Sequence, residues 1–171
     1  MQEIDVALLV LRAVFGLFLS WHGVNKVRSG LDGTARWFGS IGMTHPRLQA
    51  RLAAAVETAG GVAFAAGIAT PLASAAVTAV MLVAIVTVHM KVGFFIFLPE
   101  GGWEYCASIA AVSVAVGIAG PGQMSVDHLL GATNGGAGIA LAVAGGPLLA
   151  AAHLALAWRP DRDPPGGGDA G

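Results

Sequence analysis

Charged residues are scarce in this sequence. Of its 171 residues only 11% are Asp, Glu, Lys or Arg, whereas 56% are hydrophobic. Soluble globular domains carry about 25% charged residues, so the composition indicates a membrane protein. The net charge is −1 with no basic patch, which argues against nucleic acid as a partner. The acidic start, MQEID, lacks the basic region of a secretory signal peptide, and we expect the first apolar run to be a retained helix.

Cysteine is almost absent as well. The single residue, Cys106, excludes an internal disulfide, a CxxC redox pair and a Cys-rich metal site. The sequence also contains no flavin, nicotinamide or iron–sulfur motif. Any redox chemistry would therefore use a bound or external carrier.

Long apolar runs are abundant and predict an all-α fold. We expect a polytopic membrane helix bundle forming one domain over residues 1–158, followed by a short disordered cytoplasmic tail over residues 159–171. Gly145–Pro147 is predicted to break the helical pattern of the last run. The stretch 28–51, which contains Trp37, is expected to hold a short interfacial segment. The predicted spans are residues 4–26, 48–69, 72–92, 103–119 and 137–158.

The cations are distributed asymmetrically between the two sides of this predicted bundle. Apart from Arg12, all of them fall on one side, namely Lys26, Arg28, Arg36, Arg47, Arg51, Lys91, Arg159 and Arg162. Because short cytoplasmic loops are rich in Lys and Arg, we predict a multi-pass protein of a cell membrane. Its N-terminus would lie outside and its C-terminus in the cytoplasm.

Several ionisable residues fall inside the predicted spans, where each charge costs about 2.5–3.5 kcal/mol at the membrane centre. Topology places most of them toward one leaflet, with Arg12 deeper. We predict a polar site in which Glu57 and Glu104 neutralise Arg12 and Lys26, because buried charges require compensation. Neutral histidines would serve there as hydrogen-bonding or proton-relay groups. The residues concerned are Arg12, His22, Lys26, Glu57, His89 and Glu104.

Structural interpretations of the same residues stay open. Arg12 and Glu57 would form a pair that only fixes the bundle, while Lys26 would snorkel to the headgroups. His22 and His89 would alternatively ligate a haem across the bundle. Near the other side of the membrane, Asp127 and Ser125 are expected to cap a short helix. The aromatic run Phe94, Phe95 and Phe97 would anchor the interface or line the mouth through which a lipid-like molecule enters.

The order and spacing of several short motifs make the chain similar to the DoxX family of small bacterial membrane proteins. The resemblance covers nearly all of Leu8 to Leu130 and implies a four-helix core with an added fifth transmembrane helix. Relatives called DoxD are similar to membrane subunits of thiosulfate:quinone oxidoreductases, and mycobacterial-type members are associated with redox and thiol-stress assemblies. The motifs are Arg12 followed by HGVNK, then ETAGGVAFAAGIATPLA from Glu57, a helix with His89, GFF, GGWEY and GPGQMSVD.

The resemblance implies the membrane subunit of a quinone-linked oxidoreductase or redox assembly, with menaquinone or ubiquinone as substrate and no bound cofactor. His22 and His89 would lie near the ring oxygens, and Lys26 and Arg12 would stabilise negative charge. Glu57 and Glu104 would hold these cations and relay protons. Besides the lipid bilayer, a protein partner and a homo-oligomer are expected. The alternatives are a non-catalytic scaffold that docks a partner protein and a small-solute or lipid transporter. The candidate aromatic walls are Trp21, Phe94, Trp103 and Tyr105.

Overall fold

Helices are the regular elements of the computed structural model, which describes residues 2–132 and 134–160. Within those residues there is no strand, only an isolated β-bridge between Met43 and Trp158. The prediction of an all-α membrane helix bundle is confirmed. In chain order the elements are α1 (Glu3–Arg28), α2 (Leu31–Ser40), α3 (Pro46–Ala55), η1 (Val56–Gly60), α4 (Gly61–Ala66), α5 (Thr70–Thr87), η2 (His89–Lys91), α6 (Glu104–Ala119), α7 (Val126–Leu129), α8 (Gly136–Ala140), η3 (Leu141–Gly145) and α9 (Gly146–Ala157).

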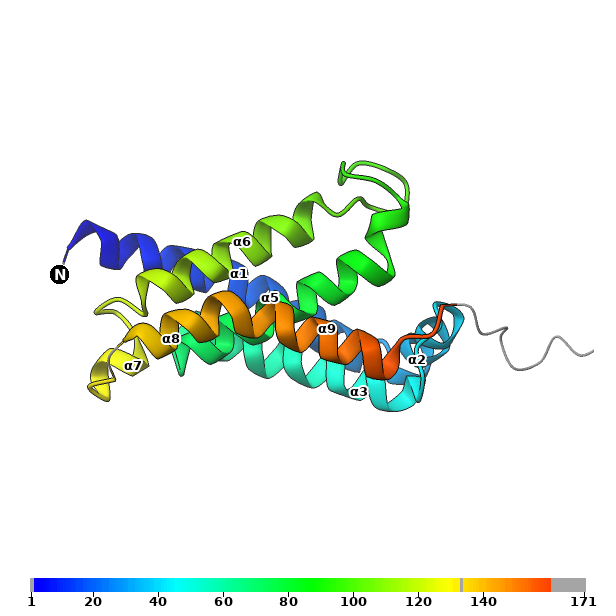
Figure 1. Ribbon diagram of the computed structural model, residues 1–171, viewed down its shortest axis with the longest axis horizontal. Coiled ribbons are helices and arrows are strands. Elements are labelled where there is room, and N and C mark those ends of the chain that lie inside the picture. Colours follow the sequence, from blue (N-terminus) through cyan, green and yellow to red (C-terminus); the bar gives the residue numbers. More distant parts are fainter. Residues whose placement is uncertain (1, 133, 161–171) are drawn as a thin grey trace, which may run out of the picture.

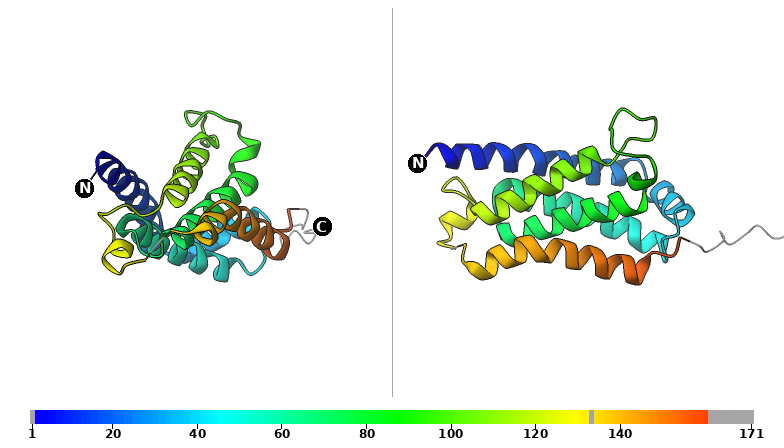
Figure 2. Two further views of the ribbon diagram at one scale, coloured as in Figure 1. Left: turned by 60° about the vertical axis from the view of Figure 1, so that its left-hand side comes forward. Right: turned by 45° about the horizontal axis from the view of Figure 1, so that its top comes forward.

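These elements combine into five rods that run along the long axis of the molecule (Figures 1 and 2). The rods are α1, the continuous α3–η1–α4, then α5, α6 and the continuous α8–η3–α9. The short helices α2 and α7 lie at opposite ends of the bundle, as Figure 1 shows. α2 is the helix found within the stretch where a short interfacial segment was expected.

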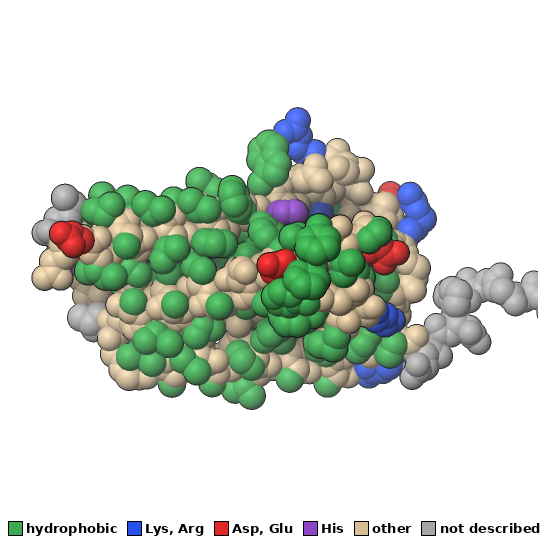
Figure 3. Space-filling view, turned by 90° about the horizontal axis from the view of Figure 1, so that it is seen from above, with side chains coloured by type: hydrophobic (Ala, Val, Ile, Leu, Met, Phe, Trp, Pro, Cys, Tyr) green, Lys and Arg blue, Asp and Glu red, His purple; other side chains and the backbone are tan. Residues whose placement is uncertain are grey.

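The outside of the bundle is suited to lipid. Three of the rods, α1, α5 and α8–η3–α9, are long and apolar enough to cross a membrane, and α6 is a shorter apolar helix. Large apolar side chains point outward, including Leu17, Trp21 and Leu156, which is 78% exposed. The space-filling view shows a largely hydrophobic flank, with Lys and Arg gathered toward the end that carries α2 (Figure 3). Within the described residues this cationic end holds every Lys and Arg except Arg12, and Arg162 lies outside the described residues.

The last rod differs from its prediction. Gly145–Pro147 does not break the helix, because the chain widens into the π-helical turn η3 directly before α9. A proline in an α-helix clashes with the carbonyl four residues earlier. Here Pro147 occupies the first turn of α9, where its missing N–H is tolerated. The rod therefore continues through this point.

Glycines set the contact between α1 and the α3–η1–α4 rod. A Cβ atom added at Gly61 would lie 2.5 Å from the carbonyl oxygen of Gly16 and 2.7 Å from the backbone nitrogen of Ser20. Thr58 in turn packs against Gly23. Small residues allow membrane helices to approach until their backbones touch.

Replacing Gly61 by alanine is therefore expected to destabilise the bundle by about 1–3 kcal/mol, the usual penalty of overpacking. Gly60→Ala is the matched control, because its added Cβ would meet only Val56 Cγ1 at 3.9 Å. Both substitutions gain the same helix propensity, about 1 kcal/mol. In mixed micelles, the free energy of unfolding of Gly61→Ala should be well below that of Gly60→Ala. Equal stability of the two variants would show that this contact does not set the helix packing.

Candidate functional site

A cavity of about 730 Å³ lies inside the bundle toward the cationic end. All five rods contribute to its wall, and Trp37 and Phe38 of α2 line it as well. The volume falls within the range of about 300–1,000 Å³ that is typical of ligand sites. Most of the lining is aliphatic or aromatic, with a limited set of polar side chains.

An ion pair forms the polar centre of this cavity. Lys26 Nζ of α1 donates to Glu57 Oε2 of η1, and both residues line the cavity. The Glu57 side chain is 9% exposed and that of Lys26 is 23% exposed. In so apolar a setting each charge stabilises the other, since an unpaired buried charge is strongly unfavourable. Glu57 stands in a π-helical turn, a feature frequently found at functional sites.

An aromatic pair and the single thiol flank the ion pair. His22 of α1 and Tyr105 of α6 both line the cavity, with ring centroids 6.4 Å apart. Cys106, which is buried and free, lines the same wall as Tyr105. The site thus offers an ammonium group, an imidazole and a phenol as hydrogen-bond donors, next to a carboxylate.

His89 reaches the cavity from the segment that follows α5. Its Nδ1 lies 2.7 Å from the carbonyl oxygen of Gly101. A carbonyl oxygen only accepts, so Nδ1 carries the proton of this hydrogen bond. In neutral His89 the other nitrogen, Nε2, is then an acceptor, and the ring lines the cavity.

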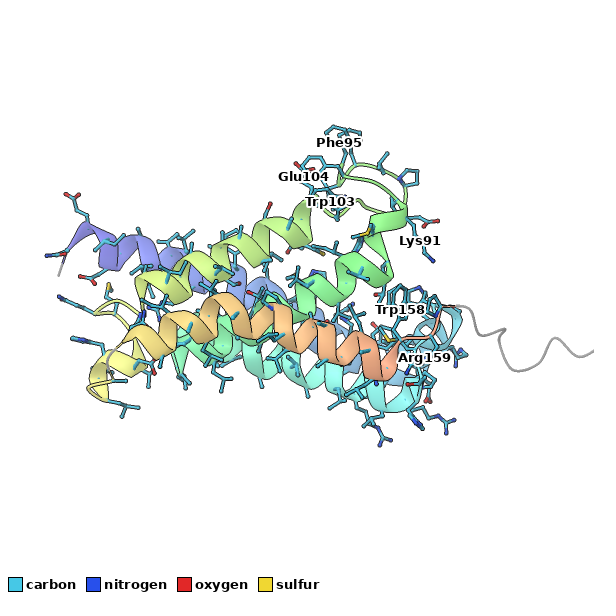
Figure 4. The ribbon with its side chains drawn as sticks, viewed as in Figure 1. Lys91, Phe95, Trp103, Glu104, Trp158 and Arg159 are labelled. Carbon is cyan, nitrogen blue, oxygen red and sulfur yellow. The ribbon has the colours of Figure 1, made fainter. Side chains whose placement is uncertain are left out.

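Half of the residues predicted for the site lie outside the cavity lining. Glu104 accepts a hydrogen bond from the backbone of Ile96 at 3.2 Å and so holds the loop before α6. Phe94 packs against Trp103 at a centroid distance of 4.6 Å within that loop. Figure 4 shows Phe95, Trp103 and Glu104 together on this outer loop. Trp21 is 65% exposed on the outer face of α1.

Arg12 is the largest departure from the predicted arrangement. It does not pair with Glu57. Its Nη2 donates to the carbonyl oxygen of Met124 at 2.6 Å, in the loop before α7. The side chain is fully buried and packs on Gly67, at the end of the bundle opposite α2. Asp127 is the nearby carboxylate that interacts electrostatically with the Arg12 guanidinium. The chain therefore has two separate polar centres.

Asp127 also has a different role from the predicted one. Ser125 does cap the short helix α7, through a hydrogen bond from His128 N at 3.1 Å. The Asp127 carboxylate instead accepts from the backbone of Ala69 at 2.7 Å and of Thr70 at 2.8 Å. It thereby caps the N-terminus of α5, where the helix dipole favours a negative charge.

Part of the sequence matches a known protein family. A family model described as DoxX matches residues 7–90, which include most of α1, the Lys26–Glu57 pair and His89. Over these 84 of its 171 residues the chain belongs to the DoxX family. The DoxX chain is also 29% identical over 136 residues to a Bacillus subtilis (strain 168) protein named "Putative oxidoreductase CatD", a match covering 78% of this chain and 96% of that protein. No solved structure matches the chain significantly.

The cavity of this DoxX chain includes polar residues that the sequence did not single out. His153 of α9 and Gln49 of α3 both line it. His153 is the only titratable residue between residues 136 and 157, and that isolation in an apolar run was the available signal. α9 lies beyond the family model's match, so the fifth rod adds a wall and a histidine to the site.

Proposed function

We propose that this DoxX chain is the membrane subunit of a quinone-linked oxidoreductase, with the cavity as its quinone site. The observation that carries the proposal is an apolar cavity inside a membrane bundle whose polar groups include the Lys26–Glu57 pair. The name of the Bacillus subtilis relative, an oxidoreductase, supports redox chemistry in general terms.

The groups in the cavity suit the chemistry of a quinone. A quinone is a flat ring with two carbonyl oxygens, carried on a long apolar chain. Lys26, His22 and Tyr105 are donors that can bind a ring oxygen and stabilise the negative charge that develops on reduction. Glu57 is the carboxylate placed to exchange protons beside them.

The balance of the proposed reaction is simple. The quinone takes up two electrons and two protons and becomes a quinol, with one proton added to each ring oxygen. The electrons come from a reduced partner protein or a small reductant, which is oxidised in the same step. The chain's own residues bind the ring and supply the path for protons.

The direct test is to extract the purified protein with organic solvent and measure quinone by chromatography. We expect about one quinone per chain, and a change in its absorption when a reductant is added in the presence of the native membrane partners. Uptake of solutes into proteoliposomes without any bound quinone would support the transporter alternative instead.

For the orientation in the membrane, we propose that the cationic end faces the cytoplasm. The charge distribution between the two ends supports this, because short cytoplasmic loops are enriched in Lys and Arg. The N-terminus and α7 would then face outward.

Single cysteines test that orientation in a Cys106→Ala background. In right-side-out membrane vesicles, a membrane-impermeant maleimide should label Leu129→Cys, because Leu129 on α7 is 82% exposed. Lys91→Cys at the cationic end should react only after the vesicles are opened. The Cys106→Ala parent provides the unlabelled control. The reverse labelling pattern would place the cationic end outside.

A further inference from the structure

The cavity has two chemically different parts. The part between α1, η1 and α6 holds the Lys26–Glu57 pair, His22 and Tyr105. The part between α3, α5 and α9 is lined mainly by aliphatic side chains, and His153 is its titratable residue. A ligand that fills both parts would therefore have a polar head and an apolar chain.

α9 is held on two sides but not on the side toward α3. Along its length it packs on α5, where Gly146 faces Thr78. At its end Trp158 Nε1 donates to Ile41 O at 2.8 Å, and Thr44 N donates to Ala157 O at 2.8 Å. α9 and α3 hardly touch one another in between.

The seam between α3 and α9 is one place where the cavity reaches the surface. Leu52 of α3 and Leu149 of α9 both line the cavity, yet they are 44% and 48% exposed. A residue that is exposed and also lines the interior marks an opening. The neighbouring outward residue Leu148 is 68% exposed, so this opening lies on a lipid-facing flank.

The other borders of the cavity also carry exposed lining residues, namely His22, Trp37 and Ile96. These residues adjoin the polar part or the cationic end, not an aliphatic flank. On the side of α1 and α6, the rings of His22 and Tyr105 lie within aromatic contact range, at 6.4 Å. Toward the cationic end, Trp37 and Phe38 of α2 cover the cavity. At the same end, the hydrogen bonds of Thr44 with Ala157 O and of Trp158 with Ile41 O hold the end of α9 against the segment that follows α2.

We infer that an isoprenoid chain leaves the cavity between α3 and α9 and continues into the bilayer, while the head of the ligand stays beside Lys26 and Glu57. The inference rests on the proposed function and narrows it to quinones that carry a long chain. The aliphatic wall binds the chain through burial of apolar surface, so each buried methylene adds to affinity.

A tryptophan placed in the seam tests the inference. Ala152 lines the cavity at this opening, whereas its neighbour Ala151 is exposed and does not line it. Ala152→Trp and the matched control Ala151→Trp would be purified in detergent beside the wild type. The Kd would be measured for a long-chain ubiquinone and for the same benzoquinone ring without its chain.

We expect Ala152→Trp to weaken binding of the long-chain quinone at least about tenfold, the loss expected when a few methylenes are no longer buried. Binding of the chain-free ring should change less than about twofold, and Ala151→Trp should resemble the wild type with both ligands. Leu52→Trp repeats the test from the opposite wall, in case Ala152→Trp fails to fold.

Two results would overturn the inference while leaving the proposed function intact. One is that both seam variants bind the long-chain quinone as the wild type does. The other is that they lose both ligands equally, which would mean that the seam holds the ring instead of the chain. If the wild type binds neither quinone, the proposed function fails and the inference fails with it.

Discussion

Glu57→Gln should lower quinone-dependent turnover by about two to four orders of magnitude, the range that a positioned acid or base contributes, in a variant that still folds but is less stable than the wild type. Glutamine keeps the shape of the side chain and can still accept a hydrogen bond from Lys26, but it cannot exchange a proton. Turnover of a quinol analogue in membranes and the thermal midpoint of the purified variant would be measured together.

Glu104→Gln is the matched control for this prediction. It makes the same chemical change in a residue that the sequence placed in the same site, but Glu104 holds the outer loop through Ile96 N and does not line the cavity. Its turnover should remain within about twofold of the wild type, because a surface substitution has little effect away from the site. If both variants lose activity equally, or Glu57→Gln loses none, the cavity is not the proton-exchanging site.

A double variant separates charge compensation from chemistry. Glu57→Gln alone leaves the Lys26 ammonium without its counter-ion in an apolar cavity, which destabilises the fold. Adding Lys26→Met removes that unpaired charge, so the double variant should recover stability without recovering turnover. Recovery of both together would mean that Glu57 acts only by holding Lys26.

The all-α bundle could be predicted because hydrophobic run length is a local property of the sequence. Each of the five rods overlaps its predicted span, and Pro71 and Pro46 begin helices as proline in a first turn favours. The incorrect prediction of a helix break also has a local origin. Gly145–Pro147 looks like a break, yet the π-helical turn η3 accommodates the proline.

The partners of the buried charges depend on helix register, which the sequence does not determine. Gly16 lies against Gly61, and Gly23 lies against Thr58. Arg12 precedes Gly16 by one helical turn and therefore lies against Gly67. Ser20 also contacts Thr58, because its hydroxyl donates to Thr58 O at 3.2 Å. Eight residues separate Ser20 from Arg12, which at 1.5 Å per residue is about 12 Å along the helix. Glu57 is therefore out of reach of Arg12 and within reach of Lys26.

Arg12→Met is expected to destabilise the fold by about 1.5–3 kcal/mol, because it removes the hydrogen bond that the buried guanidinium donates to Met124 O. Arg12 is fully buried, donates to Met124 O and lies within the electrostatic influence of Asp127. Methionine fills much of the same space but restores neither the charge nor the hydrogen bond. Unfolding in mixed micelles would measure the loss.

Arg28→Met supplies the comparison on the same helix. Arg28 is exposed at the cationic end of α1, and its loss should change stability by less than about 0.5 kcal/mol. A double-mutant cycle of Arg12→Met with Asp127→Asn should show coupling, since neighbouring charges do not contribute additively. Equal stability of Arg12→Met and Arg28→Met would show that the buried guanidinium does not hold this end together.

Substitutions in the two polar centres should then affect different quantities. Asp127 caps α5, and Arg12 ties α1 to the loop before α7, so both act on the end of the bundle away from the cavity. Arg12→Met should lower the amount of folded protein while each folded molecule keeps its quinone-dependent turnover. Glu57→Gln should lower turnover in each folded molecule. Activity normalised to folded protein distinguishes the two, and a loss of specific activity in Arg12→Met would mean that Arg12 influences the cavity from a distance.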